Sequence, residues 1–197
     1  MECELNDAIW VAKSLFERNK ATGSSANLSF RHGDKVYITG SGTCFGRLTK
    51  DDFSVMSISG EHIEGIKPSK EFTLHKTLYE KDERIEAIIH THSYYSTLWS
   101  CLDHKNTKDI VPEYTPYLKM RVGTIGLIPY APPGTDELFR AFEKRIHDSD
   151  GYILQNHGPI LGAKDIISAF YDLEELEEST RIAWALKNKE ANKIEDF

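Results

Sequence analysis

Cysteine is scarce in this chain, and its scarcity excludes a disulfide framework. The 197 residues contain only Cys3, Cys44 and Cys101. The number is odd, and no two of them have the spacing of a zinc-binding motif. A chain of this length buries roughly 70% of the surface its unfolded form exposes, so it can fold without cross-links. This cysteine usage favours a reducing compartment, and we expect the protein to be cytoplasmic.

Long apolar runs and an excess of basic residues are missing as well. No stretch approaches the roughly 20 apolar residues that span a bilayer. The N-terminus lacks the basic and apolar regions of a secretory signal. Lys and Arg number 24 against 31 Asp and Glu, which gives a net charge of −7. We therefore expect neither a membrane nor a nucleic acid as a partner, although a local basic pocket for an anionic metabolite stays possible.

Segments with helical and strand-like patterns are interleaved along the chain. Apolar residues at helical spacing predict helices over residues 6–20 and 164–189 and a helix capped by Ser69. Short strand-like segments are also present, at residues 27–31, 36–39, 53–58, 85–89, 152–154 and 159–161 and as broken pieces within 120–129. Several are joined by short turns, which indicates a mixed sheet with helices on its faces. No linker divides the chain, so we expect residues 1–197 to form a single α/β domain.

The most informative motif is His90-Thr91-His92, which follows the apolar run at residues 85–89. Such a run is typical of a buried strand. Residues two apart on a strand point to one face, so the two imidazoles lie about 6–7 Å apart along the backbone and can aim at one point. His157 also follows a strand-like segment and precedes a glycine.

Three neutral imidazoles suit a divalent ion, and they leave zinc one open position, as in catalytic sites. The alternative is that these are ordinary buried histidines bonded to the backbone. The alternating pair together with a third histidine favours the metal site.

Other polar residues could bind an anion or move a proton. Asn27, Ser41 and Gly42 offer an amide, a hydroxyl and a backbone N–H, and Ser69 offers a hydroxyl at a predicted helix N-terminus, where an anion is favoured. Each also has a purely structural interpretation, as a turn residue or a helix cap. Glu71 is either an acid/base or a carboxylate that complements the helix dipole.

The order of these motifs resembles the class II aldolase/adducin family over roughly residues 6–187. The motifs that carry the resemblance are Ala26–Ser29, Ile38–Gly42, Lys67–Glu71, His90–Ser93 and Asn156–Gly158. The resemblance implies an α/β/α sandwich around a mixed, mainly antiparallel sheet and a homotetramer. It also implies a Zn²⁺ ion, or another divalent ion such as Mn²⁺ or Co²⁺, and a phosphorylated sugar or sugar acid as substrate.

The resemblance also assigns roles to individual residues. It implies that the metal ligands are His90, His92 and His157, that Glu71 is the catalytic acid/base and a resting metal ligand, and that the phosphate is bound by Asn27, Ser41, Gly42 and Ser69. It further suggests that Tyr117 reaches a site across a subunit interface.

Lys70 is an informative departure from the aldolase members of the family, which have a second serine at this position. The replacement adds a cation next to Glu71. The segments Ser69–Glu71, Thr115–Tyr117, Met120–Gly123 and Asn156–Pro159 look more like the 3-oxo-tetronate 4-phosphate decarboxylase branch. That substrate carries a carboxylate in addition to its phosphate, so an added lysine, Lys70, fits a second anion.

The resemblance leaves several functions open. The first is a metal-dependent lyase that decarboxylates 3-oxo-tetronate 4-phosphate and leaves the enediolate of dihydroxyacetone phosphate. The second is an aldolase that cleaves a sugar phosphate such as fuculose 1-phosphate, which leaves the same enediolate. A sugar-phosphate 4-epimerase needs further acid/base groups that the sequence does not locate. A non-catalytic module, as in adducin, does not need the metal histidines and Glu71.

Overall fold

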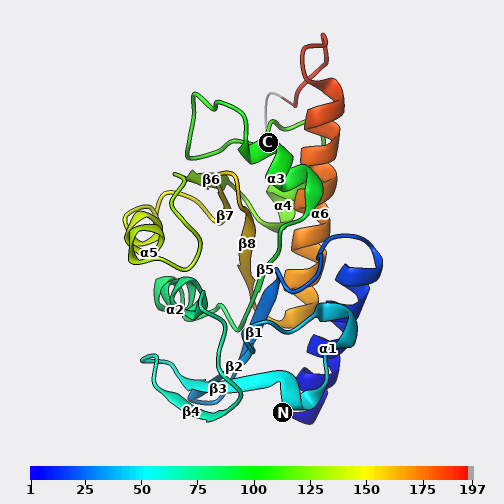
Figure 1. The fold of residues 1–197 in the computed structure, drawn as a ribbon. Coiled ribbons are helices and arrows are strands. Elements are labelled where there is room, and N and C mark those ends of the chain that lie inside the picture. The colour runs from blue at the N-terminus through cyan, green and yellow to red at the C-terminus, as the bar shows by residue number, and fades with distance from the viewer. Residues whose placement is uncertain (195–197) are drawn as a thin grey trace.

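One eight-stranded sheet forms the centre of the computed structural model, which describes residues 1–194 (Figure 1). The strands are β1 (Asn27–His32), β2 (Lys35–Thr39), β3 (Phe53–Ser57), β4 (His62–Gly65), β5 (Ala87–His90), β6 (Ile125–Ile128), β7 (Gly151–Leu154) and β8 (Gly158–Ala163). Their spatial order is β4-β3-β2-β1-β5-β8-β7-β6. Within residues 1–194 only β6 and β7 pair in parallel, and the other neighbours are antiparallel. The prediction of a mixed, mainly antiparallel sheet is confirmed.

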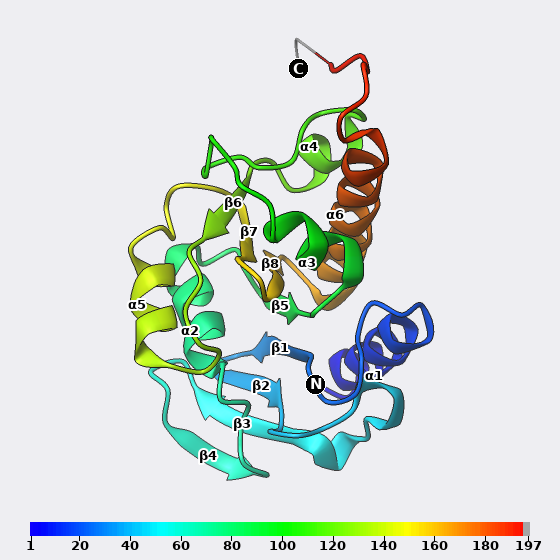
Figure 2. The same ribbon diagram turned by 45° about the horizontal axis from the view of Figure 1, so that its top comes forward.

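Helices cover both faces of this sheet, which makes the fold an α/β/α sandwich (Figures 1 and 2). On one side lie α1 (Glu2–Glu17), α3 (Tyr94–Ser100), α4 (Tyr117–Arg121) and α6 (Ile166–Leu186). On the other side lie α2 (Phe72–Lys81) and α5 (Asp136–Glu143), which contact each other. Two short 3-10 turns, η1 (Phe45–Arg47) and η2 (Lys50–Asp52), lead into β3. No helix within residues 1–194 is long and apolar enough to cross a bilayer.

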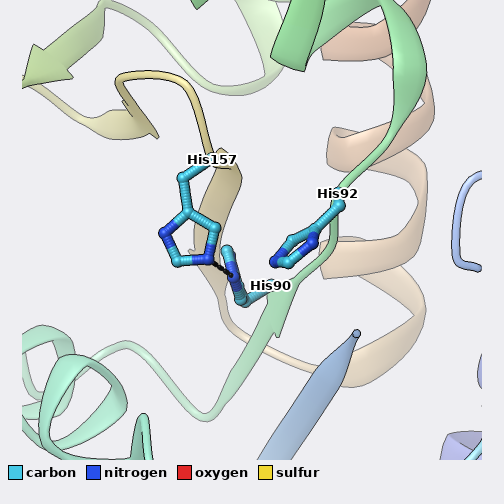
Figure 3. Close-up of side chains that lie close together, drawn as sticks. All are labelled: His90, His92 and His157. Atoms are coloured by element: carbon cyan, nitrogen blue, oxygen red, sulfur yellow. Dashed lines mark hydrogen bonds between the residues drawn. The ribbon is translucent and has the colours of Figure 1, made fainter. Parts of the chain in front are cut away.

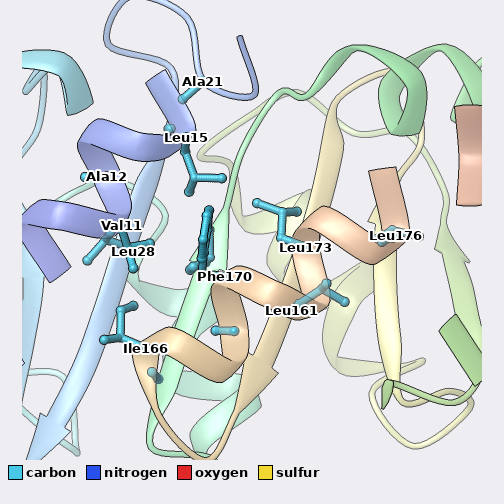
Figure 4. Packing of buried hydrophobic residues seen from close by; sticks show 14 of the residues in the cluster. Val11, Ala12, Leu15, Ala21, Leu28, Leu161, Ile166, Phe170, Leu173 and Leu176 are labelled. Atoms are coloured by element: carbon cyan, nitrogen blue, oxygen red, sulfur yellow. The ribbon is translucent and has the colours of Figure 1, made fainter. Parts of the chain in front are cut away.

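The alternation of side chains along the central strands produces two separate cores. On β5, Ile89 packs into the cluster under α1 and α6, whereas Ile88 packs into the cluster under α2 and α5. The α6 helix supplies apolar residues three or four positions apart, Phe170 and Leu173 among them, so one stripe faces the sheet (Figure 4). Asp165 caps this helix by accepting a hydrogen bond from the Ser168 N–H at 2.6 Å.

Several local predictions were wrong. The first helix begins at Glu2 rather than at residue 6, and its first turn contains acidic residues that complement the helix dipole. The α2 helix begins at Phe72 with Glu71 at its N-cap, because Ser69 lies in a turn before the helix, where its carbonyl accepts a hydrogen bond from the Phe72 N–H. Met120 lies in α4 rather than in a strand. The edge strand β4 was not predicted, and all its residues are exposed, so it lacks the alternating burial that marks a strand.

Candidate functional site

The three histidines of the sequence motif lie together at one end of the central strands (Figure 3). His90 is the last residue of β5, His92 lies two residues beyond, and His157 lies in the turn between β7 and β8. Their ring centroids are 4.6–5.2 Å apart, and one ring nitrogen from each lies within 4.8 Å of the other two. Within residues 1–194 this is the only such group of potential metal ligands.

The turn that contains His157 depends on two unusual backbone positions. Asn156 has a φ of 55°, in the left-handed region that Asn tolerates better than most residues. Gly158 approaches the backbone after β5 so closely that a Cβ there would lie 2.1 Å from the Thr91 carbonyl oxygen. A glycine is therefore required for His157 to approach the other two histidines.

The segment after His92 is held in place by Glu177, a buried carboxylate on α6. Glu177 accepts hydrogen bonds from the Ser93 hydroxyl at 2.8 Å and from the Tyr95 and Ser96 N–H groups at 2.8 and 2.9 Å. Carboxylates are favoured at a helix N-terminus, and these donors lie at the start of α3. The contact anchors the chain immediately beyond His92. The sequence gives no sign of this contact, because Glu177 lies within a long amphipathic pattern.

The imidazoles are in the chemical state that a metal ion requires. His90 is fully buried, and its Nδ1–H donates to the Pro159 carbonyl at 2.8 Å, so Nε2 keeps its lone pair. That Nε2 lies 3.3 Å from Nε2 of His157. Burial lowers the pKa of His90 to about 3 and that of His157 to about 3, and it also lowers the pKa of His92. All three rings are therefore neutral at pH 7.

We expect the metal-free protein to lose stability as the pH falls below about 6.5, the pKa of an unfolded histidine. The folded pKa values of His90 and His157 are about 3, so between these values the unfolded state binds more protons and the free energy of unfolding decreases with falling pH. Melting temperatures between pH 7.5 and 5 measure this decline. His90→Gln removes one buried imidazole and should make the decline shallower. Equal declines in the variant and the wild type would contradict the lowered pKa of His90 in the folded protein.

Glu71 lies beside the three histidines, at the start of α2. Its Oε2 is 3.4 Å from His90 Nε2, and its Oε1 is 3.4 Å from His157 Nε2. Oε2 also accepts a hydrogen bond from Asn27 Nδ2 at 3.0 Å. Oε1 of Glu71 and Nε2 of His92 are buried without a hydrogen-bond partner among residues 1–194. Leaving such groups unpaired costs about 1–3 kcal/mol each. A divalent cation satisfies both, so the donor set fits the metal that the sequence implies.

A pocket of about 340 Å³ opens in front of this group. Of the residues predicted to act in the site, eight line the pocket: Asn27, Ser41, Gly42, Ser69, Lys70, Glu71, His92 and His157. His90 is fully buried and does not line the pocket. Tyr117 is also absent from the lining and lies on α4 with 59% of its surface exposed. The structure therefore brings together all the predicted residues except Tyr117.

Two loops of the pocket are joined to each other through their backbones. The Ser41 N–H donates to the Lys67 carbonyl at 2.8 Å, and Gly40 forms a bridge with Pro68. Gly42 has a φ of 81°, which favours glycine, and its N–H has no partner among residues 1–194. These contacts place the exposed hydroxyl of Ser41 and the free N–H of Gly42 near the start of α2, and this arrangement suits an anion.

Six lining residues have no role that the sequence predicts. They are Ser24, Ser25, Ala26, Gly40, Pro133 and Gly134. The Ser24-Ser25 loop has the composition of an ordinary polar turn, which carries no signal of its own. Pro133-Gly134 enters the site only because the loop before α5 approaches Lys70, so that a Cβ at Gly134 would lie 3.5 Å from Lys70 Cβ. Local patterns do not reveal such a contact between distant segments.

A second cavity, of about 600 Å³, lies elsewhere and contains none of the predicted residues. It is lined by charged residues that are largely paired with each other. Arg84 binds Asp82, and Arg121 binds Asp172 at 2.9 Å. The smaller pocket, where a buried carboxylate meets three neutral histidines, is therefore the candidate active site.

The fold and this pocket define an α/β/α sandwich with a three-histidine group at the end of its central strands. The family model described as Class II Aldolase and Adducin N-terminal domain matches residues 6–184. The chain belongs to this family. The resemblance that the sequence motifs indicated is confirmed, and so is the fold that it implied.

Named relatives fall into two groups. A 3-oxo-tetronate 4-phosphate decarboxylase from Pectobacterium atrosepticum is 38% identical over 93% of this chain and 84% of its own length. An L-fuculose phosphate aldolase from Methanococcus maripaludis is 36% identical over 94% of this chain and 98% of its own. Among solved structures, a putative aldolase/epimerase/decarboxylase from Klebsiella pneumoniae is 35% identical and superposes with a TM-score of 0.93, covering 98% of this chain and 93% of that one.

Proposed function

We propose that this chain is a metal-dependent carbon–carbon lyase that decarboxylates 3-oxo-tetronate 4-phosphate. One observation carries the proposal: a single pocket lies against a three-histidine group and a buried carboxylate, and it is lined by two joined loops that suit an anion and by an unpaired lysine. The relatives named as such decarboxylases are 34–38% identical to this chain over at least 91% of its length. We further propose that the chain acts in the cytoplasm as one domain.

The proposed reaction breaks one carbon–carbon bond and forms one carbon–hydrogen bond. The substrate has a carboxylate at C1, a hydroxyl at C2, a ketone at C3 and a phosphate at C4. The electron pair of the C1–C2 bond moves into an enediolate over C2 and C3 as CO2 leaves. A proton then adds to C2 and gives dihydroxyacetone phosphate. The protein has to bind two anions, hold the enediolate and deliver one proton.

His90, His92 and His157 would hold the divalent ion, with Glu71 beside them as a further ligand in the resting site. When bound, the ion supplies Lewis-acid stabilisation of the negative charge that develops on the ketone and hydroxyl oxygens. Zn²⁺ suits three imidazoles well, and Mn²⁺ or Co²⁺ are the alternatives.

Glu71 is the residue that we propose moves the proton. Its carboxyl group borders the three histidines and also lines the pocket, so it lies between the metal ligands and the substrate space. A positioned carboxylic acid within hydrogen-bond reach can protonate a carbanion centre. Asn27 donates to this carboxylate and fixes its orientation.

The phosphate would lie against the two joined loops and the residue before α2. Gly42 provides a free N–H, and Ser41 and Ser69 provide hydroxyl groups on the pocket lining. Lys70 is exposed, and none of the ion pairs among residues 1–194 includes it. Its ammonium is therefore available to the substrate carboxylate, the group that distinguishes this substrate from a ketose phosphate.

Aldol cleavage of a sugar phosphate such as fuculose 1-phosphate is the second candidate, because it ends in the same enediolate and has named relatives of comparable identity. The two functions are separated by assaying the zinc-loaded protein with both substrates and measuring dihydroxyacetone phosphate. We expect the larger kcat/KM for the 3-oxo acid phosphate. A larger kcat/KM for the ketose phosphate would contradict the decarboxylase proposal and favour the aldolase function.

Lys70→Ser should weaken decarboxylation selectively. Losing one charge-assisted contact to a bound anion costs about 1.5–3 kcal/mol, or roughly 10–150-fold in kcat/KM. The same change restores the two serines of the aldolase motif, so any aldolase activity should survive or rise. Lys105→Ser, on an exposed loop outside the pocket, is the matched control. A parallel loss on both substrates would instead assign Lys70 to the shared phosphate, and no loss on either would remove it from the site.

We also propose that the family's homotetramer forms here and that Tyr117 of one subunit completes the pocket of a neighbour. What supports this is its exposure on α4, outside the pocket of its own chain. Light scattering at assay concentration measures the assembly. A fully active monomer would contradict both parts of this proposal.

A further inference from the structure

A buried polar seam runs behind Glu71, in the core between α2 and β1. Glu71, the N-cap of α2, is followed at intervals of four residues by His75 and Tyr79, so the three side chains lie along one face of the helix. Asn27 and Ser29 are two residues apart on β1 and share the face opposite to that of Leu28 and Phe30, which join the other core. The four-residue spacing along the helix and the two-residue spacing along the strand therefore place three polar side chains of the helix segment against two of the strand.

All members of the seam are buried and each contacts the next. The Tyr79 hydroxyl lies 2.7 Å from Ser29 Oγ, which lies 2.7 Å from His75 Nδ1. His75 Nε2 lies 2.5 Å from Asn27 Oδ1, and Asn27 Nδ2 lies 3.0 Å from Glu71 Oε2. Ser29 and His75 are fully buried, and Tyr79 and Asn27 are 3% and 4% exposed. The seam is a continuous chain of hydrogen bonds that ends on the carboxylate.

The chemistry of the groups permits only one donor direction in this chain. An ionised Glu71 only accepts, so Asn27 presents its amide N–H to it and its oxygen to His75. His75 must then carry its proton on Nε2, and since a neutral ring has one N–H, its Nδ1 accepts from Ser29. Ser29 in turn accepts from the Tyr79 hydroxyl. Burial lowers the pKa of His75 to about 3 and raises that of Tyr79, so the ring is neutral and the phenol keeps its proton.

We propose that His75 is a positioning residue for Glu71: its Nε2–H locks the Asn27 amide so that an N–H, and not the oxygen, faces the catalytic carboxylate. Without this lock the amide can rotate by half a turn and place its oxygen against Glu71, where two acceptors repel. Asn27 then has one N–H left for the pocket, so it links the carboxylate to the substrate space. This inference rests on the proposed role of Glu71 as acid/base.

The kinetic test compares three variants of α2 in the zinc-loaded protein. His75→Leu fills much of the same space but donates no hydrogen bond, and we expect kcat to fall about 10-fold with KM and zinc per chain unchanged. His75→Gln has a side-chain N–H for Asn27 and should recover kcat to within about 3-fold of the wild type. Thr77→Ala, on the same helix outside the seam, is the control and should match the wild type.

If His75 only contributes to the stability of the fold, the three variants should show a different pattern of kcat, melting temperature and zinc content. His75→Leu would then lower the melting temperature and leave kcat of the folded fraction at the level of Thr77→Ala, or the loss would fall on zinc content. Failure of His75→Gln to recover more activity than His75→Leu would also overturn the inference.

A second test does not depend on activity. Long-range ¹H–¹⁵N spectra of the imidazoles report which ring nitrogen carries the proton. We expect a single Nε2–H tautomer for His75 in the wild type and a mixture of tautomers in Ser29→Ala, which lacks the donor to Nδ1. A proton on Nδ1 in the wild type would overturn the lock even in an active enzyme. Inactivity of the wild type toward the 3-oxo acid phosphate would instead overturn the proposed function. The spectra would still show which ring nitrogen of His75 carries the proton and so test the direction of the hydrogen bonds in the seam.

Discussion

Glu71→Gln should lower kcat by about 10²–10⁴-fold, the usual contribution of a positioned acid or base. The amide has nearly the shape of the carboxylate, and its oxygen can still accept the hydrogen bond from Asn27. What it lacks is a transferable proton at the point where the pocket meets the three histidines. The fold should be unaffected, because Glu71 lies at the N-cap of α2 and belongs to neither hydrophobic cluster.

Glu80→Gln provides the matched control for this prediction. Glu80 lies on the same helix and is exposed, where it pairs with Lys76. Exposed pairs of this kind contribute little, so turnover and melting should both stay near wild-type values. If Glu71 only complemented the helix dipole, Glu71→Gln would behave in the same way as Glu80→Gln, with a slightly changed melting temperature and nearly full turnover.

His92→Ala should remove most of the bound metal and abolish activity. His92 supplies one of three neutral imidazoles, and its Nε2 has no other partner among residues 1–194. The variant should still fold, since a chain of this size does not require an ion for its core. Metal content per chain, measured on protein purified and dialysed together with the wild type, gives the result directly.

His147→Ala is the control for the loss of a histidine, because His147 is exposed and lies outside the pocket. It should retain both metal and turnover. Full metal content together with wild-type turnover in His92→Ala would contradict the assignment of the site.

Much of the site could be predicted from the sequence because its signals are local. The alternation of His90 and His92 after an apolar run predicts two imidazoles that aim at one point, and they do so although β5 ends at His90 and His92 lies two residues beyond it. Glycine at position 42 also reflects local geometry, because its left-handed φ favours glycine.

The parts that could not be predicted depend on contacts between distant segments. The sequence pattern around His75 is that of a packed helical residue, and its role depends on α2 lying against β1, where its ring contacts Ser29 and Asn27. Glu177 is similar, because the α3 N-terminus that it binds is not apparent from the pattern of α6. The start of α2 was misplaced because a turn at Ser69 satisfies the same backbone groups that a helix cap would satisfy.

The most direct test of the proposed metal-dependent decarboxylation is CO2 release from 3-oxo-tetronate 4-phosphate while Zn²⁺ is added to the metal-free protein. We expect one CO2 per dihydroxyacetone phosphate formed, with a rate that follows zinc occupancy and reaches its maximum at one ion per chain. Release of CO2 at the full rate without metal would contradict the proposed site, and no release at any occupancy would contradict the proposed reaction.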